Sequence, residues 1–552
     1  MSCRIYLLFD LSDQHSDQTA NKTLQFKVKM SFVVLRAIET LVSIASRFLS
    51  EYSQKNSIFP AMSLRYQNSR IIFGLKVRQL RVERGLSFSD LSKSTGMSVS
   101  YLNEIEKGKK SPKEDKVVVL AAALETTYEE LISPVLRGKL APVGELLHSN
   151  FLNELPLELF GIELSKVIEI IASAPIRVGA FISTLVELSR NFALKEENFY
   201  FHAVRAYQEL HYNYFEDIEK AIDKFITDFE FPVKRAIPFS LLADILKKKF
   251  KYEIIEDDFT NYPELQHLRS IYVPKKKRLY LNAQLNEEQK NLQLGKELAY
   301  NYLKLKERIN TSSFFKVSNF QIVLNNYIAG YFAVGLLVNR TSFLNDLRYL
   351  FGQTTWDKAY LFQLLLKYDV SPEVLFQRFN VLPNYFGITK LFFIRMIYDP
   401  ETKDFSIDKE LHLNRRHEPH ANGLEEHYCR RWASITHLKK LITSGSGQPE
   451  VGIQFSKYAV TEEEYICFTI ARPAYMPARK HVSVTIGLLV DNELREKIKF
   501  LKDPSIPRRI VGVTCERCPV SDCQERAVPP VIIEKKLRRV KIEQALKQLM
   551  NS

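Results

Sequence analysis

The spacing of apolar residues predicts a compact helical domain on the N-terminal side of the chain. From Ile71 to about Leu131, apolar positions recur every three or four residues, which is the period of one helix face. Gly85, Gly96 and Gly108 interrupt this pattern, and glycine commonly ends helices or forms turns. We therefore expect several short helices within residues 70–135, after an N-terminal extension, residues 1–69, that has no consistent pattern.

Residues 136–235 have the pattern of longer helices. One helix face carries an aromatic and aliphatic stripe, made of Tyr200, Val204, Tyr207, Leu210 and Tyr214. Such a stripe is typical of a buried core or of a helix–helix interface. We interpret this range as a helical linker that also dimerises the protein.

From residue 236 onward the pattern changes to short strand-like runs mixed with helices, which predicts an α+β domain over 236–400. A strand-rich domain, 401–552, follows, and it ends in a basic amphipathic helix. The expected fold class is therefore multi-domain, all-α on the N-terminal side and α+β on the C-terminal side.

Composition and charge narrow the class of protein. The 552 residues are 45% hydrophobic and 26% charged, as in soluble globular proteins. The net charge of +14 suits a polyanionic partner, either nucleic acid or an acidic membrane surface. The best apolar stretch, 31–49, carries Arg36, Glu39 and Arg47, and these charges are costly in hydrocarbon. We expect a cytoplasmic protein without a membrane partner, since the pattern of a secretory signal is also missing.

A candidate DNA-binding motif lies at residues 85–112, "GLSFSDLSKSTGMSVSYLNEIEKGKKSP". A short helix with Leu91 inward meets a turn at Gly96, and a second helix begins at Ser98 with Leu102 and Ile105 facing back. A helix presented in this way can enter the major groove, where side chains near its N-terminus reach base edges. The candidate contacts are Ser98, Val99, Ser100, Tyr101, Asn103 and Glu104, with Lys107, Lys109 and Lys110 placed for phosphates.

The whole pattern, with the preceding "LKVRQLRVERG" and the tail "EKGKKSP", resembles the XRE (Cro/C1-type) helix-turn-helix. The resemblance implies double-stranded DNA as partner and an ion pair between Arg81 and Glu106. Phe88 stands where many members have a polar residue that touches the operator, which puts that contact in doubt. A helical hairpin used for protein contact is the alternative.

A second motif, "LQLGKELAYNYL" at 292–303, lies where a zinc peptidase would have His-Glu-x-x-His. In that motif two histidines bind zinc and the glutamate activates water. The corresponding positions here are Lys296, Glu297 and Tyr300. A lysine brings positive charge to the place of the cation, so we expect no zinc at this helix and no enzyme activity.

The order of these parts resembles the short-chain fatty-acid-responsive regulators related to the propionate and glyoxylate-pathway regulators. These have an XRE-type domain, a degenerate ImmA/IrrE-like peptidase domain and a cysteine-bearing C-terminal domain. The resemblance implies a transcription factor whose former peptidase fold has become a sensor of short-chain acyl-CoA. Arg472, Arg479, Lys480 and His481 are candidates to receive CoA phosphates, although a solvated charged loop is the alternative.

Three cysteines, Cys515, Cys518 and Cys523, form the pattern Cys-x2-Cys-x4-Cys near the C-terminus. Two thiols at this spacing can chelate one metal, and a tetrahedral zinc or a cubane iron–sulfur cluster prefers four ligands. We choose Cys429 as the fourth ligand, and the resemblance favours an iron–sulfur cluster. Zinc and metal-free thiols remain alternatives, and Cys467, inside an apolar strand-like run, is expected to be packed.

The leading hypothesis is a homodimeric transcriptional regulator that binds a palindromic operator through residues 98–110. Two rival hypotheses are an ImmA/IrrE-type metallopeptidase with a DNA-binding domain and an antitoxin or phage-type repressor that acts by protein contact.

Overall fold

The computed structural model describes residues 62–136, 166, 196–232, 236–312, 317, 319–413, 426–474 and 480–551. Contacts along the chain group it into two compact units, Met1–Leu194 and Lys195–Ser552, and each is described by itself. Most of the predicted N-terminal extension, including the apolar stretch 31–49, lies outside the described residues. So do nearly all of the helices expected between 137 and 195.

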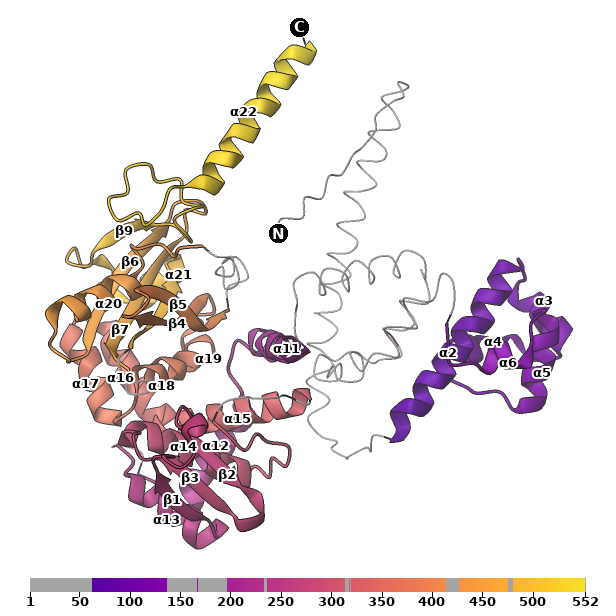
Figure 1. Ribbon diagram of the computed structural model, residues 1–552, viewed down its shortest axis with the longest axis horizontal. Coiled ribbons are helices and arrows are strands. Elements are labelled where there is room, and N and C mark those ends of the chain that lie inside the picture. Colours follow the sequence, from indigo (N-terminus) through magenta and orange to yellow (C-terminus); the bar gives the residue numbers. More distant parts are fainter. Residues whose placement is uncertain are drawn as a thin grey trace. The chain divides into compact units, whose positions relative to one another are not determined.

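The described part of the first unit is a small bundle of helices (Figure 1). The helices are α2 (Met62–Glu83), α3 (Phe88–Thr95), α4 (Val99–Glu106), α5 (Glu114–Ala123) and α6 (Tyr128–Ile132). Their inward faces form one hydrophobic core that includes Val77, Leu91, Leu102, Ile105 and Leu120. The prediction of a compact helical domain is therefore confirmed.

Two glycines set the geometry of this bundle. Gly96 has a φ of +67° and caps the C-terminal end of α3, a conformation that favours glycine. Gly74, on α2, lies against the last turn of α4, where an added Cβ would be 2.3 Å from the carbonyl oxygen of Ile105. The close crossing of α2 and α4 thus depends on the missing side chain at residue 74.

The second unit begins with helices around a small sheet. Strands β1 (Glu253–Asp257), β2 (Ser270–Val273) and β3 (Arg278–Asn282) form this sheet in the order β1-β3-β2, with β1 parallel and β2 antiparallel to β3. The surrounding helices are α11 (Glu196–Leu210), α12 (Glu216–Asp228), α13 (Phe239–Phe250), α14 (Glu287–Tyr302) and α15 (Phe320–Leu337).

A six-stranded sheet dominates the rest of this unit (Figure 1). Its order is β5-β4-β8-β7-β6-β9, and all neighbours are antiparallel except β6 and β9. The strands are β4 (Leu391–Asp399), β5 (Asp404–His412), β6 (Glu450–Tyr458), β7 (Glu464–Pro473), β8 (His481–Leu489) and β9 (Arg508–Val511). The helices of this part are α16 (Arg340–Gly352), α17 (Lys358–Tyr368), α18 (Pro372–Gln377), α19 (Leu382–Phe386), α20 (Ala433–Ser444), α21 (Asn492–Lys497) and α22 (Val531–Asn551).

The six-stranded sheet has a hydrophobic core on each face, because alternate residues of a strand point to opposite sides. On β7, Ile466 and Phe468 pack toward the larger helical layer, whereas Tyr465 and Cys467 pack on the other side, which α20 covers. Burial raises the pKa of Cys467 to about 12. The prediction that this cysteine is packed in the interior is confirmed.

The contacts divide the chain differently from the predicted ranges. The larger core of the second unit extends from Tyr214 to Ile506, so residues on both sides of the expected boundaries at 235 and 400 share it. The boundary expected at 400 falls in the turn between β4 and β5, two strands of one hairpin. The change in apolar pattern near residue 400 therefore marks a change from helices to strands along the chain, and it does not mark a boundary between two cores.

The predicted dimerisation stripe is used inside the chain. Tyr200, Val204 and Tyr214 are buried, α11 packs against α15, and the ring of Tyr207 stacks on Phe215 at 5.2 Å. The stripe is therefore a core face of the second unit, and it is not available as the interface of a homodimer. Core and interface stripes have the same apolar period, so the sequence did not separate them.

Helix α15 is the central apolar helix of the second unit. It is long and apolar enough to cross a membrane, and 67% of it is buried inside the protein. Neighbouring helices α11, α12 and α14 cover it. Its composition is thus accounted for by its place in the core.

A fully buried ion pair joins the helical layer of the second unit. The guanidinium of Arg378 donates to both carboxylate oxygens of Glu219 on α12, at 2.5 and 2.9 Å, and both side chains are 0% exposed. The Tyr331 hydroxyl on α15 also donates to Glu219, at 2.9 Å, and Arg378 Nε donates to the carbonyl of Val338. Burial alone would raise the pKa of Glu219, but the bonds from Arg378 hold it below its usual value.

We predict that Arg378→Met destabilises the second unit by roughly 3 to 5 kcal/mol, because it leaves the buried Glu219 carboxylate with only the Tyr331 hydroxyl and the more distant guanidinium of Arg340, at 3.8 Å, as partners. The double variant Arg378→Met with Glu219→Leu should recover much of that loss, since neither charge then remains. Chemical denaturation measures both effects. Lys248→Ala, which removes an exposed pair with Asp244, serves as control and should leave the midpoint unchanged. Equal losses in the single and double variants would contradict the prediction.

Candidate functional site

A short turn after α3 leaves one face of helix α4 accessible. A helix that enters a DNA groove needs such an accessible face. Ser87 caps α3 in a capping box with Asp90, and the Ser98 hydroxyl caps α4 by accepting from the Tyr101 amide at 3.2 Å. The predicted start of the second helix at Ser98 is confirmed. Leu102 and Ile105 face the core and are fully buried.

The opposite face of α4 carries the predicted base contacts. Ser98 and Ser100 are exposed, Val99 is 46% exposed, and Tyr101, Asn103 and Glu104 are half-buried. Lys107, Lys109 and Lys110 are exposed just after the helix. These residues thus lie on one accessible face, as the sequence predicted. The face is polar at the start of α4 and carries positive charge just beyond its end.

Two cations flank the ring of Tyr101. Lys116 Nζ lies 4.6 Å and Lys110 Nζ 5.8 Å from the ring centroid, and Lys110 also pairs with the Glu104 carboxylate at 2.8 Å. The Lys110–Glu104 pair is largely accessible to solvent, so it contributes little stability. These contacts hold Tyr101 and Glu104 beside a shallow groove of about 590 Å³ that the start of α5 completes. Lys116 was not among the predicted contacts.

The ion pair expected between Arg81 and Glu106 is present. Arg81 Nε donates to Glu106 at 2.6 Å and Nη2 at 3.0 Å, which ties α2 to the end of α4. The Arg81 guanidinium also lies 4.1 Å above the ring of Phe88. Phe88 therefore packs under the ion pair, and its predicted role as a DNA contact stays a prediction.

Comparisons with known proteins agree with this geometry. A family model described as "Helix-turn-helix domain" matches residues 72–132. The "Uncharacterized HTH-type transcriptional regulator y4dJ" of Sinorhizobium fredii (strain NBRC 101917 / NGR234) is 32% identical over 65 residues, 12% of this chain and 84% of that protein. The chain belongs to the HTH-type transcriptional regulators. A solved "Mycobacterium tuberculosis transcriptional regulator" covers 59% of this chain and 92% of its own, with 18% identity and a TM-score of 0.41.

The second unit of the regulator contains a cavity of about 610 Å³ beside the motif that resembles a peptidase. Its wall combines apolar side chains, such as Val204, Leu292 and Phe376, with charged groups of both signs. The cationic groups include Arg269, Lys296 and Lys409, and the carboxylates are Glu373, Asp408 and Glu410. Pockets of this size and mixed lining commonly bind small molecules. The sequence singled out Lys296 but contained no local signal for the cavity, because its wall comes from many distant elements.

The motif residues on α14 make two sets of hydrogen bonds, which the guanidinium of Arg308 links by lying 4.0 Å above the ring of Tyr300. Lys296 donates to Asn326 Oδ1 on α15 at 2.7 Å, and the Tyr300 hydroxyl donates to the same oxygen at 3.2 Å. Glu297 is buried and accepts two bonds from Arg308, at 2.8 and 2.5 Å, and one from Tyr252. Glu297, the position that activates water in zinc peptidases, is thus the counter-ion of Arg308 in this protein.

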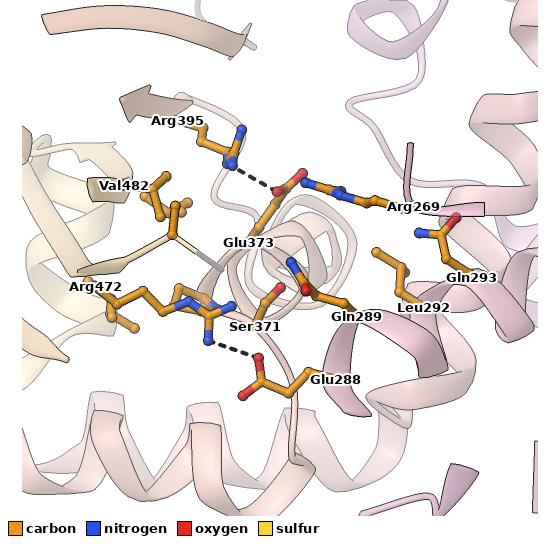
Figure 2. Close-up of a pocket in the computed structure, with 14 residues that line it drawn as sticks. Arg269, Glu288, Gln289, Leu292, Gln293, Ser371, Glu373, Arg395, Arg472 and Val482 are labelled. Atoms are coloured by element: carbon orange, nitrogen blue, oxygen red, sulfur yellow. Dashed lines mark hydrogen bonds and ion pairs between the residues drawn. The ribbon is translucent and has the colours of Figure 1, made fainter. Parts of the chain in front are cut away.

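A smaller pocket of about 40 Å³ adjoins this region and is lined by paired charges (Figure 2). Glu373 pairs with Arg395 at 3.3 Å, and Arg472 pairs with Glu288 at 2.8 Å. Burial would raise the pKa of Glu373, but Lys409 and Arg395 lower it to about 2. Arg472 and Lys480, two of the candidates for CoA phosphates, therefore pair with carboxylates, Lys480 with Asp399.

His481, another of these candidates, begins β8 and stands beside the ring of Tyr398. Arg479 lies outside the described residues.

The structure brings Cys429 beside the cysteine-rich loop, as the choice of a fourth ligand requires. The Cys429 amide donates to the carbonyl of Val513 at 3.1 Å, and the Cys515 amide donates to the carbonyl of His427 at 2.8 Å. The Gly512 amide donates to Cys429 Sγ at 3.3 Å. A Cβ at Gly512 would be 2.9 Å from Cys518 Sγ, so the missing side chain makes room for that thiol.

The four cysteines lie in one region of the second unit, but their thiols are not arranged around a single metal position. Burial raises the pKa of the Cys429 thiol to about 11, although the backbone amides of Gly512 and Arg431 oppose this shift, so the thiol is protonated at neutral pH. Cys523 is half-buried on the same loop. Within the part of the chain that the structure describes, no three His, Cys, Asp or Glu side chains are arranged to hold one metal ion. Arg526 supports the loop by donating to the carbonyl of Cys515 at 2.7 Å.

We predict that Lys109→Ala weakens binding to the operator and to random DNA by similar factors, because a phosphate contact carries no base information. The slope of log affinity against log salt should fall by about 0.9. Ser100→Ala should instead weaken only operator binding, by about 1 to 3 kcal/mol if the hydroxyl reads a base edge.

Fluorescence anisotropy on both DNAs over a salt series measures these effects, and Lys439→Ala, an exposed lysine of the second unit, serves as control. Equal losses on both DNAs for Ser100→Ala would contradict the groove assignment.

Proposed function

We propose that this regulator binds a palindromic operator as a homodimer and senses a short-chain acyl-CoA in the cavity of its second unit. The observation that carries the sensing proposal is a cavity that combines an apolar wall with two cationic groups, Lys296 and Arg269, that form no ion pair with a described residue. Among the described residues, no carboxylate lies within ion-pairing distance of Lys296 or Arg269, although both line the cavity.

The two kinds of lining match the two parts of an acyl-CoA. The acyl group and the pantetheine arm are largely apolar and suit side chains such as Val334 and Phe379. The phosphates are anions, and the guanidinium of Arg269, which Glu373 attracts without forming an ion pair, can receive one. Burial lowers the pKa of Arg269, and a bound anion would offset that cost.

The mechanism is thermodynamic linkage between the two sites. A ligand changes operator affinity only as far as it binds the two states of the protein with different affinity. Dimerisation would place two copies of α4 on half-sites about one helical turn apart, which is why a palindromic operator belongs to the proposal.

We also propose that Cys429, Cys515, Cys518 and Cys523 hold an iron–sulfur cluster, with zinc as the alternative. A cluster would supply redox or oxygen sensitivity, and zinc would supply a structural cross-link. Two observations support the site: backbone pairing joins residues 427–429 to 513–515, and amides donate to the sulfurs of Cys429 and Cys515. Metal binding would have to remove the protons of the buried thiols.

The sensing proposal predicts that propionyl-CoA changes operator affinity, measured on an operator selected from a random-sequence library. Arg269→Gln should weaken the effect of propionyl-CoA at least about tenfold, since a charged hydrogen bond contributes roughly 1.5 to 3 kcal/mol. The operator affinity of this variant, measured without propionyl-CoA, should stay unchanged. Arg348→Gln, an exposed arginine on α16, is the matched control. Superimposable titrations with and without propionyl-CoA would refute acyl-CoA sensing.

The metal proposal predicts a brown protein after anaerobic purification, with iron and sulfide that are lost in Cys515→Ser. Cys467→Ser, a change in the packed interior cysteine, should keep the iron and serves as control. One zinc per chain without colour would select the structural alternative. Wild-type protein that binds neither metal would overturn the proposal.

A further inference from the structure

Lys296 occupies an unusual place for a lysine. It stands on α14 facing α15, and the two helices approach closely because Gly295 has no side chain, where a Cβ would be 2.9 Å from that of Ala333. Protein surrounds the amine, yet it remains partly accessible because it lines the 610 Å³ cavity. Its amino group is therefore within reach of a molecule that fills the cavity.

The hydrogen-bonding partners of Lys296 are neutral. Its amine donates to Asn326 Oδ1 at 2.7 Å, an oxygen that Tyr300 shares. The Asn326 side chain, which also lines the cavity, has no further hydrogen bond from its amide nitrogen to a described residue. That nitrogen can donate to a carbonyl oxygen brought next to Lys296. An amine beside a donor for a carbonyl oxygen is the arrangement that nucleophilic attack on that carbonyl requires.

We propose that Lys296 is a covalent acylation site, at which the amine takes the acyl group of a thioester bound in the cavity. The lysine nitrogen forms a bond to the thioester carbonyl carbon, the carbon–sulfur bond breaks, and the thiol of CoA leaves. The proton lost by the amine passes to the leaving sulfur, so the products are an amide and a free thiol. The inference rests on the proposed binding of acyl-CoA and goes beyond it, because reversible sensing needs no bond.

The charges around Lys296 favour the neutral, nucleophilic amine. The net effect of these groups lowers its pKa to about 8: burial is the largest cause, Glu297 opposes it, and Lys409, Arg308 and Arg269 add smaller decreases. Glu297 is already paired with Arg308, and Lys409 with Glu373. With an ordinary pKa of about 10.4, a lysine has on the order of a hundred times less neutral amine at pH 7.

Acylation would change the cavity permanently. It removes a positive charge that has no carboxylate partner and fills part of the cavity with an apolar group. The protein would then keep its response after free acyl-CoA has been consumed.

The test incubates the full-length protein with propionyl-CoA from pH 7 to pH 10 and maps acylated lysines by peptide mass spectrometry. Lys290, on the same helix but paired with Glu256 at 2.6 Å, is the internal control. At pH 7 we expect Lys296 to react on the order of a hundredfold faster than Lys290. The rate at Lys296 should level off above about pH 9, whereas that of an ordinary lysine rises about tenfold per pH unit to near pH 10.

The thioether analogue S-propyl-CoA, which cannot transfer an acyl group, separates this proposal from the sensing proposal. Expected results are that the analogue binds, measured by calorimetry, and that its excess blocks acylation of Lys296 alone. Lys296→Arg should bind the analogue and stay unacylated in this region.

If the analogue binds but Lys296 reacts no faster than Lys290, acylation is refuted and sensing stands. If the analogue does not bind, both proposals fail. The wild-type peptide map decides even if Lys296→Arg does not fold.

Discussion

The second unit depends on the pairing of two charges that are completely removed from water. Leaving either Glu219 or Arg378 unpaired in that position would cost several kcal/mol, so α12, α15 and the segment after α18 must meet in one arrangement. The same arrangement builds the cavity, because Tyr331, which bonds to Glu219, and Phe379, next to Arg378, both form part of its wall. The geometry of the cavity is therefore a consequence of satisfying a buried ion pair.

The residues around Lys296 satisfy the polar groups that α14 places in the interior. A buried ammonium needs acceptors, and Asn326 supplies one. The glutamate of the motif would be a second buried charge, and Arg308 and Tyr252 neutralise and hold it. The polar groups of α14 thus bond to neighbouring side chains or face the cavity. Such a helix is suited to holding a ligand in place more than to activating water.

The sequence predicted the first unit well because its signals are local. Ser87, Ser98 and Gly96 fix helix ends through contacts a few residues away, and the Arg81–Glu106 pair follows from a recognisable pattern. The second unit is different. The aromatic stripe of α11 looked like an interface because period alone does not tell which surface covers it, and the cavity joins residues more than two hundred positions apart. Across a long separation, the sequence analysis chose Cys429 to join the cysteine-rich loop, and the structure places it beside that loop.

Under the sensing proposal, occupancy of the cavity must change the DNA affinity of α4, and the energies involved set a limit. A reversible effector stabilises the state that it prefers by RT ln(1 + [L]/Kd), about 2.7 kcal/mol at a hundredfold excess over Kd. That is enough to shift a balanced equilibrium between two states by about a hundredfold, and the shift vanishes when the effector is diluted. A change of charge at Lys296 would not vanish, since it alters the cavity itself. The neutral partners of this lysine matter for that reason: a salt bridge at the same place would hold the amine protonated and leave only the reversible response.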